Sequence, residues 1–318
     1  MARVKRQAIS QELLAPPARA AIFLTVTVRP GGEDVVLDLL GDLAGLTRSV
    51  AFRVPEASLS CVAGIGAELW DRMYADGPRP AYLHPFQPLT GEAHTAVSTP
   101  GDLLFHLRAE RLDLCFELSR LVMGRLADHA DVADEVHGFR YFDERDLLGF
   151  VDGSENPTGR TAAETVFVGQ EDPPFAGGSY VIVQKYLHDL EAWGRLTVEQ
   201  QELVVGRTKL DNVELSDEVK PPDSHVAANV IEDADGNERR ILRDNLPFGQ
   251  VGTQEFGTYF IGYAADPGVT EQMLRNMFLG NPPPHHDRIL DFSTAVIGCL
   301  FFAPTADFLD DPDSASLS

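Results

Sequence analysis

The sequence predicts an α+β fold of two ferredoxin-like modules, with antiparallel sheets and peripheral helices. Strand-like apolar runs alternate with amphipathic helical patterns in both halves of the chain. A glycine-rich polar segment, residues 149–160, separates the halves. Hairpin-like connections fit this pattern better than a regular βαβ series, so a dimeric α+β barrel-like arrangement is expected. We therefore predict an N-terminal module over residues 1–148 and a C-terminal module over residues 149–304.

The first half begins with an alternating apolar run and continues with a helical pattern after a turn at Pro30 to Gly32. Apolar residues recur at helical spacing in two of its stretches. The predicted strands are 21–28, 49–54, 58–65, 102–108 and 136–142, and the predicted helices are 33–46 and 112–129.

The pattern restarts after the polar segment. The predicted strands of the second half are 179–186, 239–244, 255–264 and 295–302, and its helices are 198–205 and 270–278. Residues 305–318 are rich in Asp and Ser, a composition that cannot bury a core, and are expected to form a disordered acidic tail.

Composition excludes several classes of protein. The 318 residues include 26 Lys and Arg against 49 Asp and Glu, a net charge of −23, which argues against nucleic acid or an anionic membrane as a partner. The longest apolar run, 295–303, is too short to span a bilayer. Since residues 1–10 have no apolar signal region, we expect a cytoplasmic protein.

The three cysteines, Cys61, Cys115 and Cys299, lie far apart among apolar neighbours and indicate reduced core thiols. No CxxC motif occurs, which excludes a zinc site built on one and a covalent CxxCH haem attachment.

Asp152 lies in the unusual segment GFVDGSENPTGR, residues 149–160. Glycines let a backbone approach a ligand closely, and a carboxylate on such a loop is a candidate for acid–base chemistry. A plain Asp-Gly surface turn explains the same residues equally well.

Arg243 and Asn245 are two positions apart, so on a strand they project from the same face. Together they can donate several hydrogen bonds to an oxygen species. They could equally cap a hairpin or pair with surface acids such as Glu238.

His225 follows two prolines at the start of an apolar stretch, where it is either a ligand or a satisfied core or surface histidine. His285, His286 and Asp287 could suggest a metal pair. Adjacent side chains usually diverge, however, so we do not expect the two neighbouring histidines to bind one ion.

Taken together, these stretches resemble the dye-decolourising peroxidases, and their compact spacing is similar to the bacterial B-type subgroup. Residues 149–153 match the GxxDG signature of that family. The stretches around His225, Arg243 to Asn245, and His286 to Arg288 match it in the same order. The resemblance covers roughly residues 20–304.

The resemblance implies one non-covalent haem b per chain, bound in the C-terminal module with His225 as the axial iron ligand. Asp287 would accept the Nδ1–H of that histidine. Asp152, Arg243 and Asn245 would lie on the peroxide side of the haem. Arg207 would pair with a haem propionate, because arginine pairs well with carboxylates.

The implied activity is reduction of hydrogen peroxide to water through a ferryl intermediate, with dyes, phenolic aromatics and, as a further candidate, Mn(II) as one-electron donors. Asp152 would shuttle the proton, Arg243 would stabilise the developing charge, and Asn245 would orient peroxide or water. Trp193 and Tyr186 are candidate relays for electrons, although ordinary packing explains each of them.

The resemblance also implies a homo-oligomer, whereas the short acidic tail argues against encapsulation. A non-enzymatic protein for haem binding or delivery is the main alternative function. A haem-dependent chlorite-converting enzyme and a metal enzyme built on residues 285–287 rank behind it.

Overall fold

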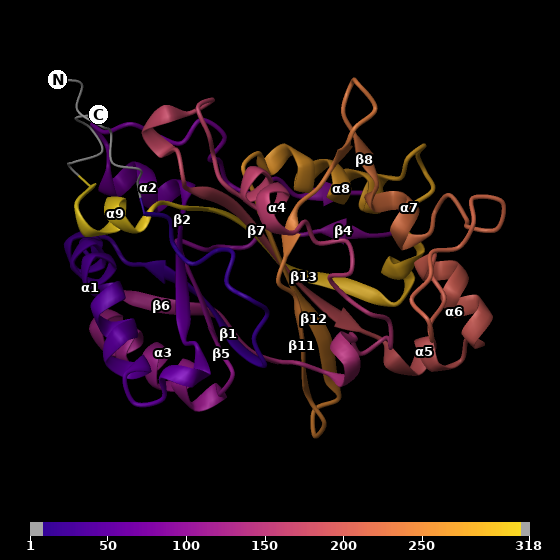
Figure 1. Cartoon of the computed structure of the whole chain (residues 1–318), viewed down its shortest axis with the longest axis horizontal. Coiled ribbons are helices and arrows are strands. Elements are labelled where there is room, and N and C mark those ends of the chain that lie inside the picture. Colours follow the sequence, from indigo (N-terminus) through magenta and orange to yellow (C-terminus); the bar gives the residue numbers. More distant parts are fainter. Residues whose placement is uncertain (1–8, 313–318) are drawn as a thin grey trace.

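The computed structural model describes residues 9–312, which form one large antiparallel sheet covered by helices (Figure 1). The strands are β1 (Ala20–Val28), β2 (Ser60–Gly66), β3 (Leu89–Thr90), β4 (Thr95–Ala96), β5 (Leu103–Ala109), β6 (Ala130–Phe139), β7 (Ser179–His188), β8 (Ile231–Glu232), β9 (Glu238–Arg239), β10 (Leu242–Arg243), β11 (Leu246–Gln250), β12 (Glu255–Ala264) and β13 (Ser293–Ala303).

The α-helices divide between the two halves. They are α1 (Glu33–Ala51), α2 (Ala67–Met73), α3 (Leu112–Leu126), α4 (Gly159–Val166), α5 (Leu190–Gly194), α6 (Val198–Val205), α7 (His225–Asn229), α8 (Pro267–Leu279) and α9 (Ala306–Asp310). One 3₁₀ helix matters for the site: η4 (Arg288–Asp291). The α+β prediction of two modules with antiparallel strands is confirmed.

A single pairing joins the halves into one sheet. The strand order is β10-β12-β7-β13-β2-β5-β1-β6, and β13 meets β2 where Phe301 pairs with Gly66 and Phe302 with Ile65. At the far end β11, paired with β12, packs against β6, with the Leu246 side chain against Gly138. Any Cβ at that glycine would clash, so the missing side chain permits the barrel-like curl.

Both faces of the inner strands β1, β2, β5 and β7 are buried, which explains why these strands are mostly apolar, whereas the edge strand β6 is largely exposed and polar. In β1, Ile22 and Leu24 belong to the core beneath the helices, whereas Ala21 and Phe23 face the inside of the curl. Alternate side chains of a strand point to opposite faces, so one run of residues supplies two cores.

Several predicted elements differ from the structure. The strand predicted at 49–54 is wrong, because α1 continues to Ala51 and keeps Leu43 and Val50 buried on one face. The strand predicted at 136–142 begins earlier, as β6, since Ala130 pairs with Val28 of β1. The strand predicted at 239–244 is two short pieces, β9 and β10.

The predicted disorder of the tail is corrected for its first part. Thr305 caps α9 through its hydroxyl, which accepts a hydrogen bond from the N–H of Phe308, and Phe308 and Leu309 are buried. The Phe308 ring stacks on Trp70 at 5.4 Å. These apolar residues outweigh the acidic composition around them. Residues 313–318 lie outside the described part of the chain.

Helices α1 and α3 lie beside the strands of the N-terminal half, and α5, α6 and α7 lie at the opposite end of the sheet (Figure 1). Helix α8 packs on β7 and β12, and α7 packs on α8. Within residues 9–312, no helix is both long and apolar enough to cross a membrane.

Candidate active site

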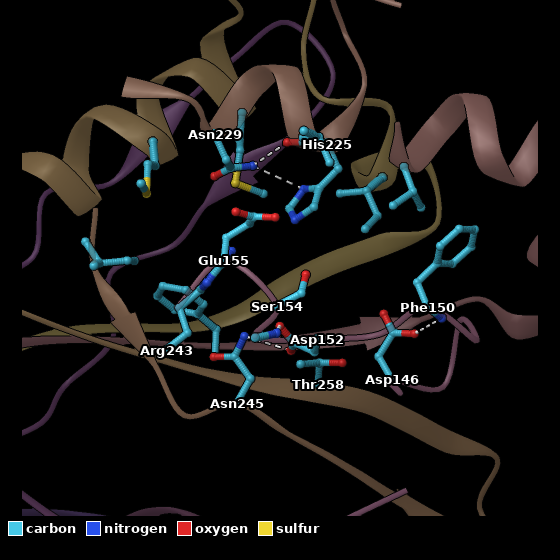
Figure 2. Close-up of a pocket in the computed structure, with 18 of the residues that line it drawn as sticks. Asp146, Phe150, Asp152, Ser154, Glu155, His225, Asn229, Arg243, Asn245 and Thr258 are labelled. Atoms are coloured by element: carbon cyan, nitrogen blue, oxygen red, sulfur yellow. Dashed lines mark hydrogen bonds between the residues drawn. The ribbon is translucent and has the colours of Figure 1, made fainter. Parts of the chain in front are cut away.

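A cavity of about 460 Å³ lies in the C-terminal half between the sheet and helices α7 and α8. This volume is within the range of about 300–1,000 Å³ that is usual for small-molecule and cofactor sites. Apolar side chains of β12 and α8 form one wall: Phe260, Met273, Leu274 and Met277. Polar groups from α7, β10 and the segment 146–155 converge on it from other sides (Figure 2).

His225, the first residue of α7, points its ring into this cavity (Figure 2). Its Nδ1 lies 2.7 Å from Oδ2 of Asp287, which is fully buried. The other oxygen of Asp287 accepts the N–H of Ile289 at 3.0 Å, so the carboxylate is held from both sides. With Nδ1–H donated to Asp287, Nε2 is the ring nitrogen left to face the cavity.

The charge of Asp287 also controls the protonation of His225. Burial lowers the pKa of this imidazole, but the charge of Asp287 and its hydrogen bond raise it more, so the net shift is upward. Arg243 opposes the rise and Asp152 adds to it, which places both groups within electrostatic range of the histidine. A carboxylate at Nδ1 also increases the electron donation of Nε2 to a metal.

Local sequence explains where α7 begins. Pro221 and Pro222 precede the helix, and Ser224 occupies its N-cap position. Gly206 ends α6 at a φ of 94°, and a Cβ there would lie 3.0 Å from the Ser224 hydroxyl. The glycine therefore serves both the left-handed turn and the close approach of α7.

Asp152 and Asn245 meet on the opposite wall. The N–H of Gly153 donates to Oδ1 of Asp152 at 2.7 Å, and Nδ2 of Asn245 donates to Oδ2 at 3.0 Å. The N–H of Ile261 donates to Oδ1 of Asn245 at 3.0 Å. This backbone bond sets which way the amide points, so the NH₂ group faces the carboxylate. The predicted pairing of these residues in one site is what the fold produces.

Arg243 lines the same wall, and its backbone is pinned by Asn156. The Asn156 side chain donates to the Arg243 carbonyl at 2.7 Å and accepts the Arg243 N–H at 2.9 Å. The Nε of Arg243 is buried without a hydrogen-bond partner within residues 9–312. A buried donor without a partner is uncommon in folded proteins, and this nitrogen is enclosed by protein.

Sequence reasoning missed Asp146, six residues before Asp152 on the same segment. It lines the cavity, and its Oδ1 accepts the N–H of Phe150 at 3.0 Å. Burial raises the pKa of Asp146 to about 7, and the charge of Asp152 adds to the rise. Its closeness to Asp152 along the chain was the available signal. Asn156 was missed as well, although it belongs to the quoted polar segment.

Arg207 lies at the mouth of the cavity, with its side chain 13% exposed. Its Nε donates to Oδ1 of Asn212 at 2.9 Å, and its Nη1 donates to Glu155 at 3.0 Å. Glu214 is 3.8 Å from the same Nη1. The arginine is thus preorganised to meet a carboxylate at this edge.

The two candidate relay residues differ in position. Tyr186 lines the cavity and is buried, with its hydroxyl donating to Gln184. Trp193 is buried in a separate cluster with Leu148 and Phe150, and its indole N–H donates to the Leu148 carbonyl at 2.9 Å. Trp193 is therefore one layer behind the cavity wall.

The residues present fit a haem. The cavity offers an imidazole Nε2, an apolar wall for a flat macrocycle, an arginine at the mouth for a propionate, and a second arginine, Arg243, on the far wall. A carboxylate behind the imidazole is the usual arrangement of a metal-bound histidine.

Comparison with known families covers nearly the whole chain. Residues 10–140 match the family model described as Dyp-type peroxidase, N-terminal, and residues 143–308 match Dyp-type peroxidase, C-terminal. The dye-decolorizing peroxidase of Rhodococcus erythropolis is 61% identical, over 97% of this chain and 90% of that protein. That of Mycobacterium tuberculosis is 59% identical, over 95% of this chain and 90% of that protein.

Solved structures agree with the sequence comparison. The encapsulated DyP-type peroxidase from Mycobacterium smegmatis has a TM-score of 0.94 at 57% identity, covering 96% of this chain and 98% of that chain. DypB from Rhodococcus jostii has a TM-score of 0.93 at 57% identity, covering 95% of this chain and 97% of that chain. The chain therefore belongs to the Dyp-type peroxidase family, and it is a haem-dependent peroxidase.

Proposed function

We propose that Nε2 of His225 is the axial ligand of haem b and that Asp152, Arg243 and Asn245 activate hydrogen peroxide on the opposite face. The observation that carries this proposal is the cavity itself, with the imidazole on one side and the three polar groups on the other (Figure 2). Arg207 pairs with a propionate at the mouth. Variants of R. jostii DypB are described in complex with heme, which supports the same cofactor here.

The haem supplies the electrons that cleave the O–O bond. Asp152 accepts a proton from the inner peroxide oxygen and returns it to the outer one. Arg243, which lines the same wall, stabilises the negative charge that develops on the departing oxygen.

We propose a role for Asn245 that differs from the expected one. One of its N–H groups is donated to Asp152 and its carbonyl is occupied by Ile261. We therefore propose that Asn245 acts chiefly by fixing the Asp152 carboxylate, and that its second N–H is left for peroxide or water.

The electron donors are dyes and phenolic aromatics. They do not enter the cavity, and their electrons pass to the haem through the protein. Mn(II) is a further donor in this proposal, since Glu155, Glu214 and Glu238 all line the cavity. A DypB variant is described in complex with manganese. Tyr186, on the cavity wall, is the better placed relay, with Trp193 behind it.

We also propose that the protein works in the cytoplasm as a homo-oligomer with an N-terminal and a C-terminal module. Its three cysteines are free, and burial raises the pKa of each thiol, as suits a reducing compartment. Closed homo-oligomers are the common case. The expectation against encapsulation rested on the tail, whose last residues lie outside the described part.

The test of the peroxidase assignment is stopped-flow absorption of the haem-loaded protein mixed with one equivalent of peroxide. Fast loss of the resting Soret band, followed by its return when a phenolic donor is added, is the expected result. A Soret band that ignores peroxide would overturn the assignment and favour haem delivery. Mass by light scattering tests the oligomer.

A further inference from the structure

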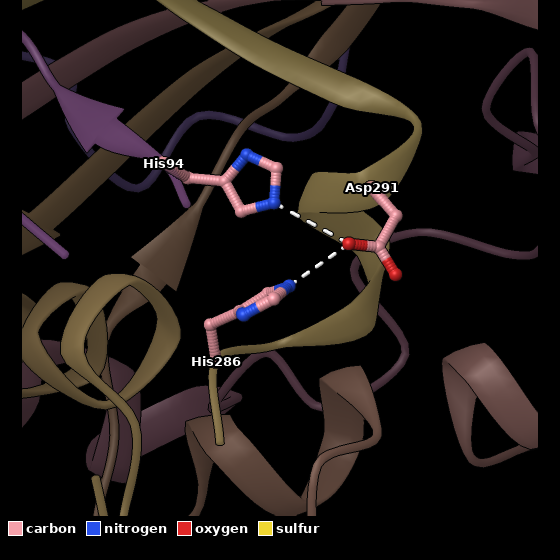
Figure 3. Close-up of side chains that lie close together, drawn as sticks. All are labelled: His94, His286 and Asp291. Carbon is pink, nitrogen blue, oxygen red and sulfur yellow. Dashed lines mark hydrogen bonds and ion pairs between the residues drawn. The ribbon is translucent and has the colours of Figure 1, made fainter. Parts of the chain in front are cut away.

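Three side chains outside the haem cavity converge from distant parts of the sequence. His94 lies in the loop between β3 and β4, and His286 and Asp291 lie on the segment that ends in η4 (Figure 3). His94 and Asp291 are 197 positions apart. This group therefore connects the N-terminal half of the chain to the last turn before β13.

Both imidazoles point at one oxygen atom. Nε2 of His286 lies 2.8 Å from Oδ1 of Asp291, and Nε2 of His94 lies 3.3 Å from the same atom. The ring centroids are 4.6 Å apart at 70°, so the rings meet edge to face. All three ligand atoms lie within 4.8 Å of one another.

This spacing suits a metal ion. Zinc binds histidine nitrogen and carboxylate oxygen at about 2.0–2.2 Å, so the ligand atoms around it are about 3–3.5 Å apart. The observed separations from Asp291 need only small side-chain movements to reach that geometry. Two imidazoles with one carboxylate favour Zn²⁺ and its first-row neighbours over Mg²⁺ or Ca²⁺.

Other histidine–carboxylate contacts in the protein show what a simple ion pair looks like. His137 meets Glu135 at 2.6 Å, and His84 meets Glu271 at 3.1 Å, each without a third ligand. Within residues 9–312, the group of His94, His286 and Asp291 is the one that brings three such ligand atoms together.

The group is also open to an ion from solvent. The side chains of His94, His286 and Asp291 are 24%, 27% and 38% exposed. Water can therefore complete the coordination sphere, as it does in metal sites with three protein ligands.

We propose that His94, His286 and Asp291 form a second metal site, selective for Zn²⁺ or a similar divalent transition metal. The ion joins the β3–β4 hairpin to the segment that carries Asp287, the partner of His225. His285 is not part of this group. The proposal does not depend on the roles assigned within the haem cavity.

The test is calorimetric titration of Zn²⁺ into the haem-loaded protein, free of any affinity tag and stripped with a chelator. Millimolar Mg²⁺ in the buffer occupies the many surface carboxylates. His94→Gln and Asp291→Asn each remove one ligand, and His137→Gln serves as the matched control because its contact has no third member. An unchanged Soret band shows that each variant is folded.

We expect one Zn²⁺ per chain in the wild type and the control, with affinity at least about tenfold weaker in both ligand variants. Zn²⁺ should also raise the unfolding midpoint of the wild type and the control but not of the ligand variants. Equal Zn²⁺ affinity in all four proteins, or no binding to the wild type, would overturn the proposal.

Discussion

In both halves of the molecule helices pack on the sheet, and the halves differ in what lies between helix and sheet. In the N-terminal half, α3 packs directly on β1 and β5, and Leu118 and Val122 are completely buried between them. In the C-terminal half, α8 covers β7 and β12, but Met273 and Met277 border a cavity. Helix α7, with His225 at its start, enters beside α8 and places polar groups where the other half has core.

A cofactor cavity comes with a loss of stabilising contacts in the half that contains it. Close-packed apolar contacts are given up on one side, and the Asp287 carboxylate is fully buried there instead. The half that contains the site is joined to the N-terminal half through the pairing of β13 with β2.

Shortening one side chain in each half tests this difference in packing most directly. Leu118→Ala should lower the free energy of unfolding by about 2–5 kcal/mol, because a filled core is left with a hole. Met273→Ala should cost less than half as much, since that side chain already borders open space. Urea denaturation of the haem-free proteins gives both values, because bound haem would fill the space beside Met273. Equal losses would mean that the two halves are equally well packed.

Removing charge from the cavity wall tests the division of labour there. Arg243→Leu should slow the reaction with peroxide by roughly 10²–10³-fold, the usual effect of losing one donor to developing charge. Asp152→Ala should slow it less, because water can relay the proton.

Stopped-flow absorption measures both rates. Arg195→Leu, which removes an exposed arginine paired with Glu191 outside the cavity, serves as the control and should change little. A larger loss in Asp152→Ala than in Arg243→Leu would reverse the proposed order.

Asp287→Asn tests how the charge of the buried carboxylate acts on His225. The amide keeps the shape of the carboxylate but not its charge, so the His225 imidazole donates less to iron. Haem affinity or peroxidase rate should fall about 10–100-fold. Haem transfer to apomyoglobin gives the affinity. Asn229→Ala, which removes a 2.7 Å bond to the His225 carbonyl and a 3.2 Å contact with its Nδ1 but no charge, should have a smaller effect.

The smallest expected effect concerns pH. Because burial raises the pKa of Asp146 to about 7 from an unfolded value of 3.8, the folded chain holds a proton that the unfolded chain lacks between these values. Its contribution to stability is therefore full below 3.8 and is lost as the pH rises to about 7.

Asp146→Asn should remove this loss. The stability of the variant relative to the wild type should rise by on the order of 1 kcal/mol between pH values near 4 and near 8. Urea denaturation across that range checks it. Parallel stability curves would show that Asp146 titrates normally.

Much of the fold followed from local pattern. The helix at 198–205 and the strand at 255–264 agree with the structure at both ends, because turn residues bound each of them. The strand predicted at 49–54 failed, since β-branched and aromatic residues at a helix end imitate a strand. The helix at 306–310 was missed because the burial of Phe308 against Trp70 is a tertiary contact.

The site residues also divide into those that the sequence indicated and those that it did not. Asp152, Arg243 and Asn245 were proposed from their motifs, and all three line the cavity, although Asn245 lies between β10 and β11 rather than on a strand with Arg243. Asp146 was not found, because its raised pKa comes from burial that only the folded chain provides. The meeting of His286 with His94 rather than with His285 was equally out of reach.

By itself, the sequence determined the class of fold, the family and the cofactor, and it proposed the residues for the chemistry, since these depend on local pattern and on ordered motifs. Only the tertiary structure decided that both halves share one sheet, that the C-terminal half keeps a cavity, and which carboxylates lie behind or beside the key groups. The physical reason is range. Propensity and spacing act over a few residues, whereas burial, charge and ligand geometry arise between segments such as residues 94 and 291 that only folding brings together.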